Sequence, residues 1–221
     1  MKGLLLLIGS FLLVSCAALP LVRPPTGSLG KTFTCPSPFF TEKTRLIHAI
    51  EVRAAGKTQT VMIGVTITDP VTRSISCALM SAEGMVIFEA AAGPDGLKIS
   101  RALPPFDSGD FARNMMDDID LIFLAPQEAL AQQGVLAAGE RVCRRHKKQG
   151  GWIDVSEGRD GRIQIRRYSE GGSLKRSVTL TGRPFNPYST IELHASELVS
   201  YTLMMTLIES EAVQDEPQLM E

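Results

Sequence analysis

The sequence is poor in the residues on which metal and covalent chemistry most often depend. It contains 3 histidines and 4 cysteines in 221 residues. His48, His146 and His194 are too scattered to supply the roughly four ligands of a zinc site. We find no grouping of Ser, His and Asp that indicates a nucleophile, and no phosphate loop or nucleotide fingerprint. We therefore predict a protein that is not an enzyme and that binds no metal and no cofactor.

The sequence also lacks an excess of charge of one sign. Its 23 Lys and Arg residues balance 24 Asp and Glu residues, whereas nucleic-acid binding depends on a surplus of basic side chains. The apolar run over residues 3–14 is shorter than the roughly 20 residues that a membrane-spanning helix needs. These absences exclude nucleic acid as a partner and exclude a transmembrane helix as an anchor. With 44% hydrophobic and 21% charged residues, the composition is that of a globular domain with a real core.

The N-terminus has the pattern of an export signal. Met1-Lys2 gives a charged start, and the apolar run after it falls in the roughly 7–15-residue range of signal peptides. Leu13-Val14-Ser15-Cys16 closes the run and resembles the bacterial lipobox. This resemblance implies a lipoprotein signal peptide over 1–15, cleavage before Cys16 and lipid attachment at Cys16.

The lipobox resemblance also implies a location. The protein would be held to a membrane by acyl chains such as palmitate, and Ala17 after the acylated cysteine fits the periplasmic face of the outer membrane. The alternative is an ordinary secretory signal cut near Ala17-Ala18-Leu19, in which Cys16 is incidental.

The region after Cys16 is rich in proline and glycine. This composition predicts an acylated N-terminus and a flexible tether over 16–43. An exported compartment permits disulfides, and three cysteines remain, Cys35, Cys77 and Cys143. An odd number allows at most one internal bridge, whose pair is left open. We expect the leftover thiol to be a buried small hydrophobe rather than a reactive group.

Alternating apolar and polar residues predict a strand-rich domain over 44–208. Leu46, His48 and Ile50 begin the alternation, and a period of two is typical of half-buried strands. About eleven strands are expected, near 46–53, 61–68, 75–79, 86–90, 97–102, 139–147, 152–155, 162–168, 174–181, 190–195 and 198–208. An acidic tail follows over 209–221.

A helical insert is expected at about 107–133, between the two groups of strands. Asp107 or Ser108 can cap it, and Phe111, Met115, Ile119 and Ile122 recur at helical spacing. Asp117, Asp118 and Asp120 fall on or beside the polar side of this helix, where they indicate solubility.

This order of elements is similar to that of LolA and LolB, a carrier and a receptor of lipoproteins. The stretch from Gln59 through Ser76-Cys77 to Phe88, with Gly151-Trp152, Ile191-Glu192-Leu193 and Tyr201-Thr202-Leu203, resembles uncharacterised LolB-like bacterial lipoproteins. The resemblance implies a mainly β protein, a single antiparallel sheet of about eleven strands curled into an incomplete, half-open barrel. It also implies that the central helical insert covers the concave face.

The resemblance leads to a candidate site between sheet and helix. We expect its apolar lining to be Val61, Ile63, Val65, Ile67, Leu79, Phe88, Phe111, Met115, Ile119 and Ile122. These side chains could close into a dry core or line a cavity for acyl chains. The function expected is that of an outer-membrane lipoprotein that binds lipid acyl chains or handles lipoproteins in the periplasm. The alternative is a structural or adaptor lipoprotein that docks a periplasmic protein through a sheet edge or the basic segment 141–148, which contains Arg144 and Arg145.

Overall fold

The structure, a computed structural model, describes residues 19–25, 33–54, 56–182, 188–196 and 200–213. These residues form one antiparallel sheet of 12 strands and one α-helix. The strands are β1 Thr44–Ala54, β2 Lys57–Asp69, β3 Ser74–Met80, β4 Val86–Gly93, β5 Gly96–Ala102, β6 Leu130–Val135, β7 Arg141–His146, β8 Trp152–Glu157, β9 Ile163–Tyr168, β10 Leu174–Thr181, β11 Thr190–Ala195 and β12 Tyr201–Ala212; the helix is α1 Gly109–Phe123. The predicted fold class is confirmed, with twelve strands rather than about eleven.

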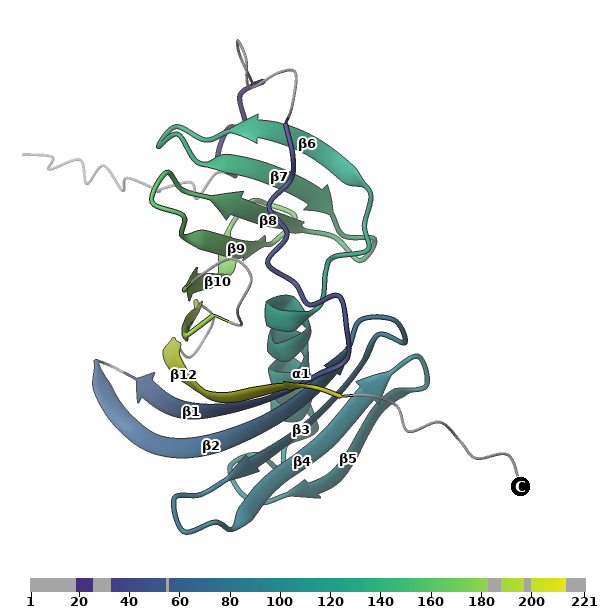
Figure 1. Cartoon of the computed structure of the whole chain (residues 1–221), viewed down its shortest axis with the longest axis vertical. Helices are drawn as coiled ribbons and strands as arrows, with labels where there is room; N and C mark the ends of the chain where they lie inside the picture. The colour runs from purple at the N-terminus through teal and green to yellow at the C-terminus, as the bar shows by residue number, and fades with distance from the viewer. Residues whose placement is uncertain (1–18, 26–32, 55, 183–187, 197–199, 214–221) are drawn as a thin grey trace, which may run out of the picture.

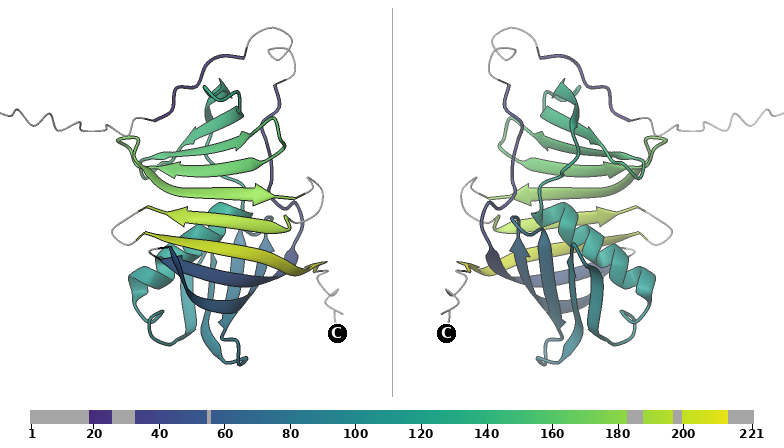
Figure 2. Two further views of the ribbon diagram at one scale, coloured as in Figure 1. Left: turned by 90° about the vertical axis from the view of Figure 1, so that its left-hand side faces the viewer. Right: turned by 90° about the vertical axis from the view of Figure 1, so that its right-hand side faces the viewer.

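The sheet is built from two meanders that meet at one long-range pairing. Its order is β5-β4-β3-β2-β1-β12-β11-β10-β9-β8-β7-β6, so every neighbouring pair except β1 and β12 is consecutive in the chain. The sheet curves strongly and leaves β5 and β6 as its two edges (Figure 1). The two views in Figure 2 show that α1 covers only one face, the concave one.

The helical insert is shorter than the sequence predicts. Ser108 caps α1 by accepting a hydrogen bond from the backbone N–H of Phe111 at 3.2 Å. The helix ends at Phe123, and Leu130–Val135 form β6, although the insert was predicted to extend to about residue 133. β6 lies at the edge of the sheet, and most of its residues are exposed. Because it has no buried face, its sequence lacks the alternation of apolar and polar residues by which the other strands were predicted.

The predicted acidic tail begins inside a strand. β12 continues to Ala212, and Thr44 pairs with Ala212 at the end of the β1–β12 ladder. Arg45 on β1 donates hydrogen bonds to Glu209 at 2.6 Å and to Glu211 at 2.7 Å. The acidic composition did not predict that residues 209–212 form part of a strand. Arg45, which pairs with Glu209 and Glu211, is far away in the sequence.

Much of the predicted tether lies against the domain. Arg23 and Val135 exchange backbone hydrogen bonds of 3.0 and 2.9 Å beside the edge of β6. Residues 33–43, which we call the strap, run across the concave side towards β1 (Figure 1). A disulfide joins Cys35 of the strap to Cys143 on β7. Within 19–25 and 33–43 the chain forms no helix and none of the twelve strands. Its composition gives no sign of the covalent link to a distant strand.

Residues 1–18 lie outside the described residues, and with them the predicted signal peptide and Cys16. Across the described ranges, no helix combines the length and the hydropathy that a membrane span requires.

Candidate functional site on the concave face

The concave face of the sheet is an almost continuous apolar floor. Its buried side chains join those of α1 in one cluster. The floor includes Leu46, Ile50, Met62, Ile75, Cys77, Leu79, Phe88, Val155, Ile165, Val178, Leu180, Ile191, Leu193 and Met205. Among the described residues no second sheet packs on it, and its cover is α1 and the strap.

Part of the predicted lining lies where expected. Leu79 and Phe88 are on the floor, and Ile122 of α1 is buried against it. Met115 and Ile119 are partly buried. Phe111 is 40% exposed and packs edge-on against Phe106 at 5.2 Å. Ala112 and Met116 are more deeply buried than Met115, so the buried face of α1 is rotated by about one residue from the predicted one.

The four predicted lining residues on β2 lie on the opposite, convex face. Met62 pairs with Ile50, Gly64 with His48 and Thr66 with Leu46, and directly paired residues share a face of an antiparallel sheet. Val61, Ile63, Val65 and Ile67 therefore point away from the helix. The predicted period of two was right, but its phase was wrong because the inward residues of β2 are the smaller and more polar set.

Close packing explains why the inward face of β2 is small. A Cβ atom added to Gly64 would lie 2.5 Å from Ile50 Cδ1 and 3.4 Å from Leu79 Cδ2. The glycine thus makes room for two apolar side chains of the floor. The hydrophobicity pattern of β2 cannot reveal this arrangement, because the residues that Gly64 allows to be buried, Ile50 and Leu79, lie on the neighbouring strands.

The four outward residues of β2 form an apolar patch with their neighbours on the convex face of the sheet. Cross-strand pairing places Ala49 and Met80 on either side of Ile63, and Ile47 and Ala78 on either side of Val65. We call the set Ile47, Ala49, Val61, Ile63, Val65, Ile67, Ala78 and Met80 the convex patch. Val61 is 51% exposed, and contiguous exposed apolar surface of this kind is typical of interaction sites.

An ion pair beneath α1 fastens the helix to the sheet. Arg176 on β10 donates from Nε to Asp118 Oδ1 at 2.7 Å, and the Tyr201 hydroxyl on β12 donates to Asp118 Oδ2 at 2.8 Å. Arg167 Nη2 lies 3.8 Å from the same carboxylate. Burial raises the pKa of Asp118, and Arg176 and Tyr201 oppose that rise. The prediction that Asp118 serves solubility was wrong, because its partners come from strands at least 49 residues further along the chain.

A small cavity lies where α1, the strap and the sheet meet. It has a volume of about 10 Å³ and is lined by Pro38, Phe40, Leu46, His48, Ile122, Phe123, Leu180, Tyr188 and Ile191. The centroid of the Phe123 ring lies 5.9 Å from that of the His48 ring and 6.2 Å from that of the Phe40 ring. His48 is 1% exposed, as its place in an apolar alternation predicts, and burial lowers its pKa to about 4.

A larger groove near the C-terminal end of α1 is polar and mixed in charge. It has a volume of about 110 Å³, and its lining includes Arg73, Lys147 and Arg167 together with Asp117, Asp120 and Glu128. Arg73 already pairs with Asp120 at 3.2 Å. Because charges of both signs face this groove, it has no preference for one class of ion.

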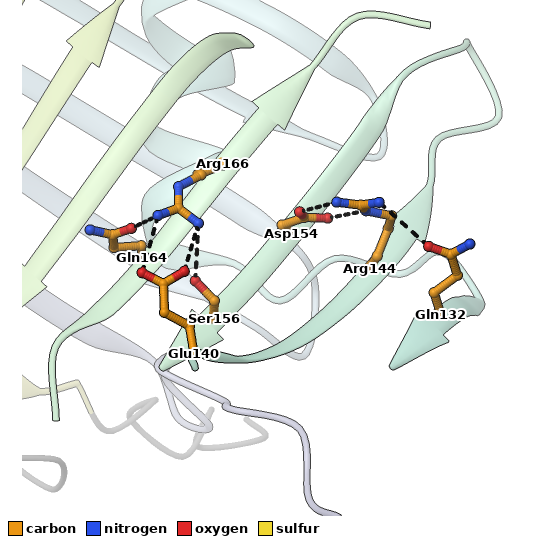
Figure 3. A network of polar contacts seen from close by, with 7 residues as sticks. All are labelled: Gln132, Glu140, Arg144, Asp154, Ser156, Gln164 and Arg166. Atoms are coloured by element: carbon orange, nitrogen blue, oxygen red, sulfur yellow. Dashed lines mark hydrogen bonds and ion pairs between the residues drawn. The ribbon is translucent and has the colours of Figure 1, made fainter. Parts of the chain in front are cut away.

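The predicted basic docking segment is partly buried. Arg144 holds Asp154 through two hydrogen bonds of 2.7 Å, and both side chains are almost fully buried (Figure 3). Beside this pair, Arg166 contacts Glu140, Ser156 and Gln164 (Figure 3). Arg144 is therefore unavailable to headgroups or a partner, since its charge is neutralised by the strand next to its own.

The described residues offer little for covalent or metal chemistry. No three His, Cys, Asp or Glu side chains within them gather as metal ligands would. Burial raises the pKa of Cys77 to about 12, and its Sγ lies 3.5 Å from Met116 Sδ. Cys77 is thus the buried small hydrophobe that the sequence predicts for the leftover cysteine.

No protein family matches the chain, and no curated protein does. Among solved structures, a LolA superfamily protein from Nitrosomonas europaea is similar, with 11% sequence identity and a TM-score of 0.46 over 81% of this chain and 90% of that chain.

Proposed function

We propose that this protein binds acyl chains of lipids or lipoproteins between the concave sheet and its cover, and that it does so without catalysis. The observation that carries the proposal is the apolar floor, which is covered by one helix and one irregular strap rather than by a second sheet. We further propose that acylation of Cys16 holds the protein on the periplasmic face of the outer membrane. Its partners in this proposal are the membrane and the acyl chains that it takes up.

Acyl chains can enter only if the cover moves. The cavity of about 10 Å³ is far below the roughly 300–1,000 Å³ of ordinary ligand pockets. Between the Cys35 bridge and the start of β1, the strap can lift from the floor, because Phe39 and Phe40 are only partly buried. Burial contributes roughly 0.8 kcal/mol per methylene, so ten methylenes would contribute roughly 8 kcal/mol, against up to roughly 3 kcal/mol for each Phe displaced.

Native mass spectrometry and binding of a neutral apolar fluorophore test the proposal. The full chain carrying Cys16→Ser, which removes the predicted lipid attachment, should retain copurified lipid and bind the fluorophore. Phe40→Ala should increase fluorophore binding because it removes part of the cover. Ile63→Ala, on the convex patch, is the matched control and should leave binding unchanged. A protein that carries no lipid and binds no fluorophore, with or without Phe40→Ala, would overturn the proposal.

The convex patch favours a second candidate function, that of an adaptor that docks a protein. The charged side chains at its rim form ion pairs: Arg53 pairs with Glu51 at 2.9 Å, and Arg45 pairs with Glu209 at 2.6 Å. A rim without surplus positive charge favours an apolar protein surface over anionic lipid as the occupant.

Site-specific photo-crosslinking in cells tests this second candidate. A photoreactive residue at position 63 should give a discrete protein adduct. The same residue at position 179 should give none, because Thr179 on β10 lies outside the patch. Equal crosslinking at both positions, or none at either, would exclude the patch as a docking surface.

A further inference from the structure

The small cavity under the cover has an uneven lining. Seven of its nine lining side chains are apolar, and His48 and Tyr188 are the two with polar atoms. Pro38, Phe40 and Tyr188 are only half-buried, whereas Leu46, Ile122 and Leu180 are buried. The cavity therefore has an outer side near the strap and an inner side that continues into the apolar floor.

Among the described residues that line this cavity, His48 carries a buried polar atom without a hydrogen-bond partner. The side chain is 1% exposed, and its Nδ1 atom has no hydrogen-bond partner among the described residues. Buried polar atoms in proteins nearly always have a partner, and an exception requires an explanation. If the His48 ring only filled space, a Phe ring would do the same without burying an unpaired polar atom. The His48 ring borders a cavity, where a bound group could pair with that atom.

The lining also limits the charge of what can bind. Among the described residues, no Lys or Arg side chain lines the cavity, and Arg176, also on the concave side, already pairs with Asp118. A carboxylate or phosphate placed there would be buried without a counter-charge, which is strongly unfavourable. A neutral imidazole can donate or accept one hydrogen bond at Nδ1, depending on its tautomer. The matching ligand group is therefore polar but uncharged.

We propose that His48 hydrogen-bonds an uncharged oxygen-bearing group, an ester or a hydroxyl, at the polar end of a bound acyl chain. This inference rests on the proposed acyl-chain binding and specifies its ligand class. The cavity is close to the size of one water molecule, which suits a single oxygen-bearing group. The polar end lies under the strap beside His48, and the chain extends along the floor from Leu46 and Leu180.

Competition against a neutral apolar fluorophore tests the inference with ligands of one chain length. The probes are monooleoylglycerol, oleyl alcohol, oleate and 1-octadecene, added to the full chain carrying Cys16→Ser. We expect monooleoylglycerol and oleyl alcohol to bind about five-fold more tightly than 1-octadecene, the factor that one net hydrogen bond provides. They should also bind more tightly than oleate, because the site has no counter-charge.

Three variants assign this preference to one atom. His48→Phe keeps an aromatic ring beside Phe123 and should bind alcohol, ester and alkene alike. His48→Gln keeps a hydrogen-bonding group and should retain part of the preference; it decides the question if His48→Phe does not fold. His194→Phe is the matched control, since His194 is exposed on the opposite face, and should behave like the parent.

The outcomes separate this inference from the proposed function. If the parent binds all four probes equally, or if its preference survives His48→Phe, the role of His48 is wrong while acyl-chain binding stands. If oleate binds most tightly, the uncharged ligand class is wrong. If none of the probes binds, the proposed function itself fails.

Discussion

The two parts of the cover are held to the same sheet in different ways. α1 is fastened by apolar packing and by the buried contacts of Asp118 with Arg176 and Tyr201. The strap is fastened by the Cys35–Cys143 disulfide and by the partial burial of two phenylalanines. The sheet below is also held by backbone ladders between every pair of neighbouring strands. The two attachments can therefore be broken one at a time, which separates the contribution of α1 from that of the strap.

The largest expected effect comes from breaking the attachment of α1. Asp118→Ala removes a carboxylate that pairs with the buried Arg176 guanidinium, and we expect a loss of about 3–5 kcal/mol in the free energy of unfolding. The measurement is urea unfolding followed by circular dichroism. Fluorophore binding by the folded variant should rise, because the helix is less firmly held.

Asp154→Ala is the matched comparison for Asp118→Ala. It breaks the Arg144–Asp154 pair, which is equally buried but lies on the face of the sheet away from α1. We expect a similar loss of stability and no change in fluorophore binding. If both variants change binding alike, general loosening rather than release of the helix is responsible.

Releasing the strap should have the next largest effect. Cys35→Ser removes a disulfide that links residues 108 positions apart, and loss of a native bridge costs about 2–5 kcal/mol. The free energy of unfolding should fall by this amount in the absence of reductant. A reducing agent should destabilise the parent but leave Cys35→Ser unchanged. An equal response of both proteins to reductant would show that this bridge does not constrain the chain.

Acid should weaken the core through His48. Burial lowers the pKa of His48 from 6.5 to about 4, so the unfolded chain binds a proton between these values that the folded protein does not. The free energy of unfolding therefore has its full value with respect to His48 above about pH 6.5, and it decreases as the pH falls to about 4. The difference corresponds to roughly 3 kcal/mol.

His48→Gln isolates this contribution from that of the carboxylates, which titrate in both proteins. Burial raises the pKa of Tyr188, the other titratable group at the cavity, so Tyr188 stays neutral in acid. Urea unfolding at pH 7 and pH 4 should show that the parent loses roughly 3 kcal/mol more than the variant. Parallel losses would mean that His48 is protonated in the folded protein.

The smallest effect is expected on the convex patch. Ile63→Thr should change the free energy of unfolding by less than about 1 kcal/mol, because the side chain faces outward. Met62→Thr, one residue earlier and facing the floor, should cost about 2–4 kcal/mol. The pair tests the phase of β2 directly, and the reverse order of losses would contradict the observed register.

The sequence predicts the strands well and the faces less reliably. In β1 the inward set of Leu46, His48 and Ile50 follows from alternation, because the outward residues include charges. In β2 both faces are largely uncharged, so hydrophobicity selects the wrong one. Asp118 is missed for a related reason. A carboxylate on a helix looks solvent-exposed until a strand about 60 residues later supplies its guanidinium partner.

By itself, the sequence determines the order of all the strands except β6, a capped start of α1 at Asp107 or Ser108, and the apolar face of β1 on which His48 lies. These features depend on residues close together in the chain, and local periodicity and side-chain chemistry decide them. Only the tertiary structure decided which cysteines pair, which face of β2 is the floor and which acid fastens α1. Each of these depends on curvature of the sheet, which brings distant segments together on one side.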